Sequence, residues 1–378
     1  MRVAVAAALL AAIPAALLWA AVTYLSSVVL ALTLVVLWYF GCCLFAASVR
    51  NGALLCLSTM LVLAATEGFL RSGILRSIVA KQYDGVVVTE DKPFWMDDPD
   101  VGYRLIPNIR VHTTKSRNNT LVYDVVTTTD ENGFRRDGLP AVDGPRVMLL
   151  GDSFTFGEGL NDDETLGYFF KKKSFDAVNI GMPGTGPHQS LRQLQVGLPR
   201  KGAQTYRYIV LTVIDDHLVR ANGGRPWLRD SPRFEVDASG QLVLMGNFQS
   251  RFAFVEKVLI GSRVVSMIVD AFESDSTEEE RRFVGILSEI DRLAAAEYGA
   301  KLLVVYHAGT VILGDLVGNR AKMHELFRRA GVDFIDIYAA LPDIERNMNR
   351  YLIPFDAHPT GALNEAIVDL IVPRLVGQ

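Results

Sequence analysis

The chain has 378 residues, of which 50% are hydrophobic, and its mean hydropathy is +0.22. This length allows two units of ordinary domain size, and the hydropathy is high for a protein with no part in a membrane. The net charge is −4, which excludes the strongly basic balance that is typical of nucleic-acid-binding domains. We therefore expect no nucleic-acid partner.

The N-terminal residues 1–76 are predicted to be a transmembrane anchor in a lipid bilayer. Two apolar runs, at 3–23 and 28–47, each have about the ~20 residues that cross a hydrocarbon core, and 53–70 is a shorter third candidate. A cleavable signal peptide has a much shorter apolar region. The sequence therefore predicts two to three helices that stay attached to the protein.

The charges around these runs predict their orientation. Arg2 and Arg50 flank the first two runs on one side of the membrane, which the positive-inside rule makes cytoplasmic. A third run then carries the remaining chain out of the cytoplasm, and Glu67 near its end is interpreted as an interfacial residue. All three cysteines lie within the anchor, so the rest of the chain forms no disulfide and no thiolate metal site.

Residues 77–140 are predicted to be an extended lead-in that packs on the domain after it. The segment is polar and lacks helical periodicity, but 121–129 is rich in β-branched residues and bounded by turn residues, which indicates a strand. We expect Phe94, Trp95 and Tyr103 to hold the lead-in against the following domain.

Residues 141–378 are predicted to form an α/β domain with a parallel sheet, because apolar strands alternate with helices. A capping box at 276–279 opens one helix, and the last helix follows Thr360. The insertion 222–272 interrupts the alternation with a hairpin and a very apolar helix at 252–272. The expected strands are 146–150, 177–180, 208–214, 301–306 and 332–337.

The first of these strands ends at Gly151-Asp152-Ser153, which would place one hydroxyl at the carboxyl end of the sheet, where ligands bind in such folds. A nucleophilic serine requires a base within hydrogen-bond reach and an acceptor that orients the base. His358 lies in a loop just before the last helix, and Asp356 lies two residues upstream. We predict that Ser153 is the nucleophile, His358 the base and Asp356 the orienting carboxylate.

Three short blocks together resemble the SGNH/GDSL hydrolase family: Gly151-Asp152-Ser153, Asn179-Ile180-Gly181 and the Asp-x-His that precedes the last helix. The resemblance covers roughly 141–378. Upstream, the spans ending in Glu67 to Arg71 and the blocks 100–108 and 133–136 resemble membrane-anchored bacterial members.

The resemblance implies a three-layer flavodoxin-like fold and ester hydrolysis or acyl transfer by the same three residues. It also implies that the backbone N–H groups of Ser153 and Gly181 bind the oxyanion, and that no metal or organic cofactor takes part. For an anchored bacterial member it implies the inner membrane, with the catalytic domain in the periplasm.

One block departs from the family. After the strand 208–214 the family usually has an asparagine whose amide donates to the oxyanion, but this chain has Asp215-Asp216-His217. Loss of one such donor typically costs ~10²–10³ in turnover. Three alternatives are open: Asp215 is protonated, it points away, or His217 takes the role. His188, which follows the oxyanion glycine, is a second candidate for contact with substrate.

Three functions are consistent with these residues. The first is a membrane-anchored serine esterase that removes acyl groups, O-acetyl among them, from cell-envelope carbohydrate. The second is an O-acyltransferase that uses the same triad to acylate a glycan together with a membrane partner. The third is a catalytically degenerate subunit that binds glycan or supports assembly.

Overall fold

The computed structural model describes residues 85–198, 205–249, 276–308 and 320–377. The predicted anchor at 1–76 and the predicted apolar helix at 252–272 lie outside these residues. No helix within the described ranges is long and apolar enough to cross a membrane. The described residues belong to one unit, made of Gly85–Gln249 and Asp275–Gln378.

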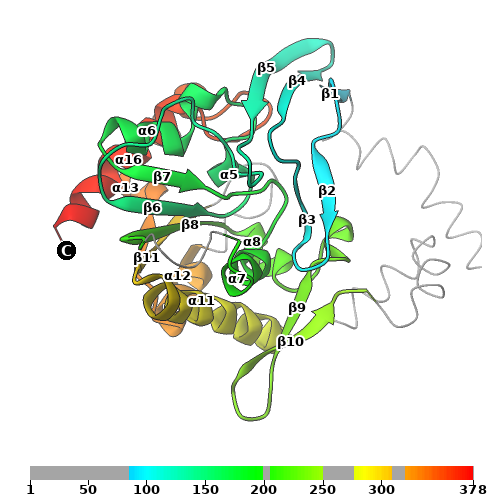
Figure 1. The fold of residues 1–378 in the computed structure, drawn as a ribbon, viewed down its shortest axis with the longest axis vertical. Coiled ribbons are helices and arrows are strands. Elements are labelled where there is room, and N and C mark those ends of the chain that lie inside the picture. Colours follow the sequence, from blue (N-terminus) through cyan, green and yellow to red (C-terminus); the bar gives the residue numbers. More distant parts are fainter. Residues whose placement is uncertain (1–84, 199–204, 250–275, 309–319, 378) are drawn as a thin grey trace, which may run out of the picture. The chain divides into compact units, whose positions relative to one another are not determined.

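The centre of this unit is a five-stranded sheet in which every neighbouring pair is parallel, in the order β12-β11-β8-β6-β7 (Figure 1). Numbered along the chain this is 2-1-3-4-5, the order of flavodoxin-like sheets. The predicted α/β class and parallel sheet are therefore confirmed. The strands are β6 (Arg146–Leu150), β7 (Asp176–Asn179), β8 (Tyr208–Ile214), β11 (Lys301–His307) and β12 (Phe334–Asp336).

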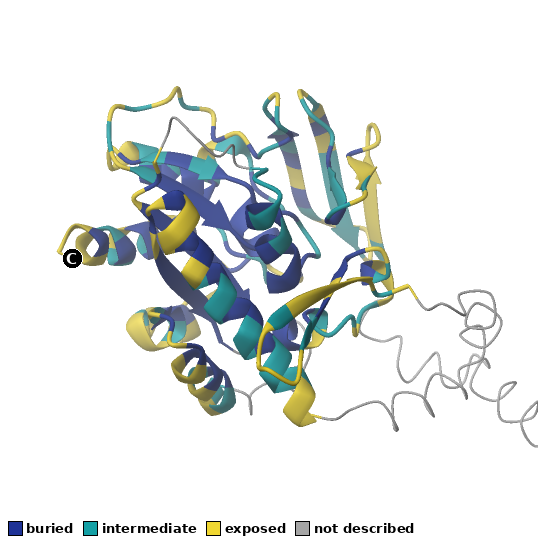
Figure 2. Ribbon diagram, turned by 60° about the horizontal axis from the view of Figure 1, so that its bottom comes forward, coloured by how far each residue is buried: buried dark blue, intermediate teal, exposed yellow. Residues whose placement is uncertain are grey.

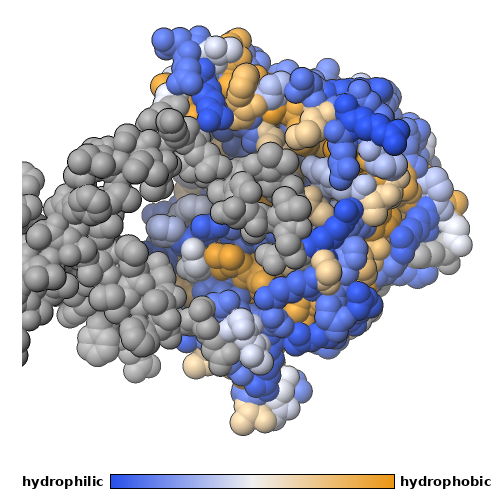
Figure 3. Space-filling model, turned by 180° about the vertical axis from the view of Figure 1, so that it is seen from behind, coloured by the Kyte–Doolittle hydropathy of each residue, from blue (hydrophilic) through white to orange (hydrophobic). Residues whose placement is uncertain are grey.

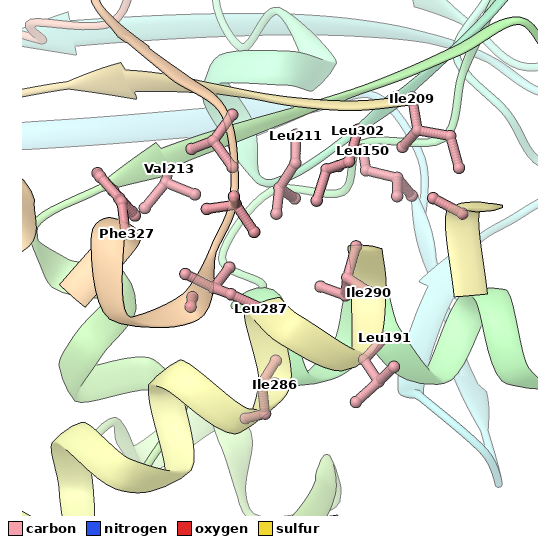
Figure 4. Close-up of a cluster of buried hydrophobic side chains, with 14 of the residues drawn as sticks. Leu150, Leu191, Ile209, Leu211, Val213, Ile286, Leu287, Ile290, Leu302 and Phe327 are labelled. Carbon is pink, nitrogen blue, oxygen red and sulfur yellow. The ribbon is translucent and has the colours of Figure 1, made fainter. Parts of the chain in front are cut away.

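Helices cover both faces of this sheet, so the body has three layers. Alternate residues of β6 face opposite sides, with Met148 and Leu150 in one apolar core and Val147 and Leu149 in the other. The first core lies under α7 (Pro187–Gln195), α11 (Ser276–Tyr298) and α12 (Arg320–Ala330). Figure 4 shows how Ile286, Leu287 and Ile290 of α11 and Leu191 of α7 meet the strand residues there.

The second core lies under α6 (Leu166–Lys172) and α16 (Gly361–Val376), on the opposite face. Because the sheet has helices on both sides, most residues of its strands are buried, and Figure 2 shows its arrows largely in dark blue. The remaining short helices are α5 (Ser153–Phe156), α8 (Asp216–Arg220), α13 (Ile337–Ala340), α14 (Asp343–Arg346) and α15 (Met348–Tyr351), with 3₁₀ turns η2 (Asp162–Glu164) and η3 (Pro226–Leu228).

The lead-in contains two small antiparallel sheets, with strand orders β1-β4-β5 and β2-β3. The predicted strand at 121–129 is β5, whereas its partners were not predicted individually. The strands are β1 (Val86–Glu90), β2 (Trp95–Asp98), β3 (Gly102–Leu105), β4 (Arg110–Arg117) and β5 (Thr120–Thr128). The predicted hairpin in the insertion is also confirmed, as β9 (Pro232–Val236) and β10 (Leu242–Asn247).

The lead-in packs on the α/β body through both apolar and polar contacts. Phe94 packs edge to face on Phe156 of α5, at 5.7 Å between ring centroids. The buried guanidinium of Arg135 donates to the carbonyl of Leu160 at 2.9 Å and pairs with Asp162. These contacts fix the N-terminal sheets beside the carboxyl edge of β6.

Polar side chains dominate the face of the molecule in Figure 3, where exposed apolar residues form only small groups. Among the described residues with exposed large apolar side chains are Trp227, Met245 and Phe355. Phe355 directly precedes Asp356, so one of these exposed side chains adjoins the predicted site.

Candidate active site

Ser153 lies at the point where the strand order of the sheet reverses. From β6 the chain crosses through α6 on one face to β7, and then through α7 on the other face to β8. The crevice outside the carboxyl ends of the strands is the usual ligand site at such a switch point. Ser153 is the first residue of α5, directly after β6, and is 6% exposed.

The turn between β6 and α5 depends on Gly151 and Asp152. Gly151 has φ of +139°, and a Cβ there would lie 2.4 Å from Oγ1 of Thr155, so no larger residue fits. The side chain of Asp152 caps α5 by accepting the N–H of Phe154 at 3.0 Å. This sharp turn presents the Ser153 hydroxyl at the edge of the sheet.

The structure brings the three predicted catalytic residues together. Nε2 of His358 lies 2.8 Å from Oγ of Ser153, and Nδ1 of His358 hydrogen-bonds to Oδ1 of Asp356. With its Nδ1–H donated to the carboxylate, a neutral His358 has a lone pair on Nε2 that faces the serine hydroxyl. This is the arrangement that a general base for serine requires.

A tight loop explains how an aspartate only two residues from the histidine can orient it. Phe355 and Ala357, on either side of Asp356, have φ of +64° and +69°. The N–H of Ile353 donates to the carbonyl of His358 at 2.8 Å, and the N–H of Ala357 donates back to the carbonyl of Ile353 at 2.8 Å. The left-handed backbone therefore folds Asp356 back towards the imidazole ring.

The charges around His358 favour its protonated form. Burial lowers its pKa, but the carboxylates of Glu158, Asp356 and Asp152 act against burial and raise the pKa to about 9. Oε2 of Glu158 lies 3.7 Å from Nε2 of His358. Burial raises the pKa of Asp356, and its pairing with His358 and Lys115 outweighs this and holds the pKa well below its usual range. Asp356 is therefore ionised at neutral pH.

Lys115 is a member of this site that the sequence did not indicate. It lies on β4 of the lead-in, 241 positions before Asp356, and its Nζ donates to Oδ2 of that carboxylate at 2.5 Å. Its neighbours in sequence are ordinary strand residues. Lys115 can be identified only from the fold, because the N-terminal sheet packs beside the loop that holds Asp356 and His358.

Asp152 anchors a second charged network behind the nucleophile. Its Oδ2 lies 2.9 Å from Nη1 of Arg220 and 3.2 Å from Nε2 of His217. Burial of Asp152 opposes its ionisation, but these two partners hold its pKa well below the usual range. Arg220 also donates to the carbonyl of Thr185 at 2.8 Å and to Asp216 at 2.7 Å. The network ties three loops at the carboxyl edge together.

The structure corrects our expectation that His188 and His217 contact substrate. His188 is 0% exposed, hydrogen-bonds to Ser231 at 3.0 Å and packs edge to face on Phe248. Burial lowers the pKa of His188 to about 3, so its ring is neutral. His217 is 1% exposed, and its ring accepts the N–H of Ile214 and faces Asp152. Both rings support the fold around the site instead of lining it.

The predicted oxyanion donors are only partly available. The N–H of Gly181 donates to the side chain of Asn179 at 3.0 Å, so this predicted donor is already used inside the fold. In the part of the chain that the structure describes, no residue accepts the N–H of Ser153 or the N–H of Gly184. The loop that contains Gly184 is held to the nucleophile turn, because the N–H of Met182 donates to the carbonyl of Gly151 at 3.0 Å.

Of the three alternatives left open by the sequence, the structure favours the one in which the Asp215 side chain points away. Its Oδ1 accepts the hydroxyl of Tyr306, and both side chains are buried. Tyr306 packs on Phe327 of α12, in the core on that face of the sheet. Asp215 is therefore engaged with the neighbouring strand β11. Burial and Asp215 together raise the pKa of Tyr306, which keeps its hydroxyl protonated as the donor.

Within the ranges that the structure describes, no group of three histidine, cysteine or carboxylate side chains has the geometry of a metal site.

No protein-family model and no curated protein matches the chain. Solved structures similar to it include a member of the lipolytic protein G-D-S-L family from Veillonella parvula DSM 2008, with 10% identity, a TM-score of 0.38, and coverage of 61% of this chain and 100% of that one. The lipase/acylhydrolase from Enterococcus faecalis has 14% identity, a TM-score of 0.34, and coverage of 62% and 96%. AlinE4, an SGNH-hydrolase family esterase, has 13% identity, a TM-score of 0.32, and coverage of 63% and 98%. The assignment of residues in this chain depends on its own geometry.

Proposed function

We propose that this protein is a serine hydrolase of the SGNH/GDSL type that acts on ester bonds, with Ser153 as nucleophile, His358 as general base and Asp356 as the orienting carboxylate. The observation that carries the proposal is the continuous chain of hydrogen bonds from Ser153 through His358 to Asp356 at the carboxyl edge of a parallel sheet. The three sequence blocks that resemble the family meet in space at this point.

The reaction follows from this geometry. Oγ of Ser153 attacks the ester carbonyl carbon while its proton passes to Nε2 of His358. In this mechanism the backbone N–H groups of Ser153 and Gly184, which no acceptor in the described fold occupies, stabilise the negative oxygen of the tetrahedral intermediate. Collapse of this intermediate breaks the ester C–O bond, and His358 returns the proton to the leaving alkoxide. Water then attacks the acylated serine by the reverse steps and releases a carboxylic acid.

The proposed setting is a bacterial inner membrane, with the catalytic domain in the periplasm and esters of cell-envelope carbohydrate, O-acetyl groups among them, as substrates. The apolar runs within residues 1–70 and the flanking Arg2 and Arg50 support an anchor of this orientation. The triad operates without a metal or an organic cofactor in this mechanism.

One observation favours transfer to an alcohol as a second candidate function. Asp215 occupies the position at which the family usually has an amide donor. Its side chain accepts a hydrogen bond from the hydroxyl of Tyr306. A site with fewer oxyanion donors hydrolyses slowly, because each donor contributes ~10²–10³ in turnover. A glycan hydroxyl, delivered together with a membrane acyltransferase partner, would then compete with water for the acylated serine. The degenerate, glycan-binding alternative predicts no acylation of Ser153.

Hydrolysis of p-nitrophenyl acetate by the full-length protein tests the proposal. The wild type should release nitrophenol and Ser153→Ala should not; equal rates in the two proteins would refute a serine mechanism. If the wild type instead accumulates an acylated Ser153 that added glycan acceptors discharge faster than water does, the transferase function is the correct one.

A further inference from the structure

Lys115 extends into the site from the N-terminal sheet, next to a break in the strand register of that sheet. On β4 it pairs with Tyr123 of β5, and the register between these strands shifts between Lys115 and Ser116. Such bulges bend a strand and change the direction in which a side chain points. Nζ of Lys115 lies 5.7 Å above the ring of Tyr123, which itself packs with Ile353 of the catalytic loop.

The contact that results is a shielded ion pair with the orienting aspartate. The carboxylate of Asp356 is 0% exposed and the Lys115 side chain is 18% exposed. His358 takes Oδ1 of this carboxylate and Lys115 takes Oδ2, so the two oxygens have separate partners. Because both oxygens are held, the carboxylate cannot rotate away from the imidazole.

The same lysine opposes an excess of negative charge around His358. Oε2 of Glu158, two residues after α5, lies 3.7 Å from Nε2 of His358. Asp356 pairs with Nδ1, and Asp152 at the β6–α5 turn is a third carboxylate that raises the pKa of His358. Within this group Arg220 pairs with Asp152, and Lys115 pairs with Asp356, the carboxylate that orients His358.

We propose that Lys115 is a positioning residue of the site, which holds Asp356 in place and offsets its charge, so that the N-terminal sheet controls how readily His358 accepts the serine proton. This inference depends on the proposed function, since it assigns Lys115 a role in the same triad. Through Lys115, the sheet β1-β4-β5 then contributes to the active site.

The test is the rate at which a fluorophosphonate probe labels Ser153 in the full-length protein, measured from neutral to alkaline pH. In Lys115→Met the midpoint of the pH profile should rise by about one unit, because a nearby positive charge no longer opposes protonation of His358. At neutral pH this is about a tenfold loss of labelling. Lys115→Arg keeps the charge and should restore the wild-type midpoint.

Lys171→Met is the matched control, because Lys171 forms a comparable shielded pair with Asp137, at 2.9 Å, between α6 and the lead-in. It should leave the midpoint unchanged. A wild type that labels with a defined midpoint, together with an unchanged midpoint in Lys115→Met, would overturn the inference and leave the proposed function intact. A wild type that does not label overturns both.

Folding is checked by circular dichroism. If Lys115→Met does not fold, Lys115→Gln, which keeps a hydrogen-bond donor without the charge, makes the same comparison. Loss of fold in both variants would contradict the inference, because Lys115 would then serve the stability of the sheet and not the tuning of the base.

Discussion

Nε2 of His358 lies 2.8 Å from Oγ of Ser153, although 205 positions separate the two residues in the chain. The contact forms because β6 and the loop before α16 both end at the carboxyl edge of the sheet. Since the imidazole is held by Asp356 on its other side, removal of the ring should leave the serine without a base. We expect His358→Ala to lower the rate of probe labelling by about 10²–10⁴-fold, the usual contribution of a general base. His324→Ala is the control, because His324 pairs with Asp336 away from the triad and should keep wild-type labelling.

The activity should depend on pH with a midpoint near 9. His358 acts as a base only when it is neutral, and the neighbouring carboxylates raise its pKa to about 9. Below this midpoint the neutral fraction, and with it the rate, rises about tenfold per pH unit, and above it the rate becomes constant. The measurement is kcat/KM for p-nitrophenyl acetate against pH, with the spontaneous hydrolysis subtracted. A midpoint close to the ordinary histidine value would show that the carboxylates do not act on His358 as the geometry requires.

Glu158→Gln should shift this midpoint downward. The charge of Glu158 raises the pKa of His358, and its Oε2 is 3.7 Å from Nε2. The substitution removes the charge but keeps the shape, so a larger share of His358 is neutral at neutral pH. We expect labelling there to increase by about tenfold, for a shift of about one unit. Glu365→Gln, at an exposed carboxylate on α16, should change nothing; an equal gain in both variants would rule out a specific effect of Glu158.

The strands of the sheet could be predicted from the sequence because apolar runs such as 146–150 and 208–214 alternate with helical segments, as expected for strands buried on both faces of a parallel sheet. The triad could be predicted because Ser153 and His358 carry distinctive neighbours. Lys115 could not, because its role depends on how a second sheet packs. His188 and His217 resembled site residues by position, but only the fold shows that their rings point inward.

Asp215→Asn should change the labelling rate by less than about threefold, because the side chain accepts a hydrogen bond from Tyr306 and an amide oxygen can accept the same bond. The family pattern alone would instead predict a gain, since an amide at this position usually donates to the oxyanion. The labelling rates of wild type and Asp215→Asn at one pH decide between the two. A gain of about 10²-fold or more, the value of one oxyanion donor, would contradict the structure.

Arg220→Met should destabilise the fold as well as the site. Arg220 is 11% exposed and pairs with Asp152, whose carboxylate is 0% exposed, so its loss leaves a buried charge with fewer partners. Breaking a buried pair in this way costs about 3–5 kcal/mol in free energy of unfolding. Since the folded-state pKa of Asp152 is lowered, this stabilisation is present at neutral pH and is lost as the pH falls through that pKa.

Denaturant titration of the full chain at neutral pH measures the effect. Arg374→Met provides the comparison, because Arg374 and Asp333 form an exposed pair, and such pairs contribute about 0–1 kcal/mol. Similar losses in the two variants would show that the Asp152 network contributes no more to stability than a surface ion pair.

The central claim is that Ser153 is a nucleophile activated by His358, and covalent labelling with a fluorophosphonate tests it without knowledge of the natural substrate. The full-length wild type should gain one probe molecule on Ser153, identified by mass spectrometry of its peptide, and should do so faster as the pH rises towards 9. Ser153→Ala should gain none, and His358→Ala should label far more slowly. A folded wild type that remains unlabelled, or a Ser153→Ala variant that labels as fast as wild type, would contradict the account.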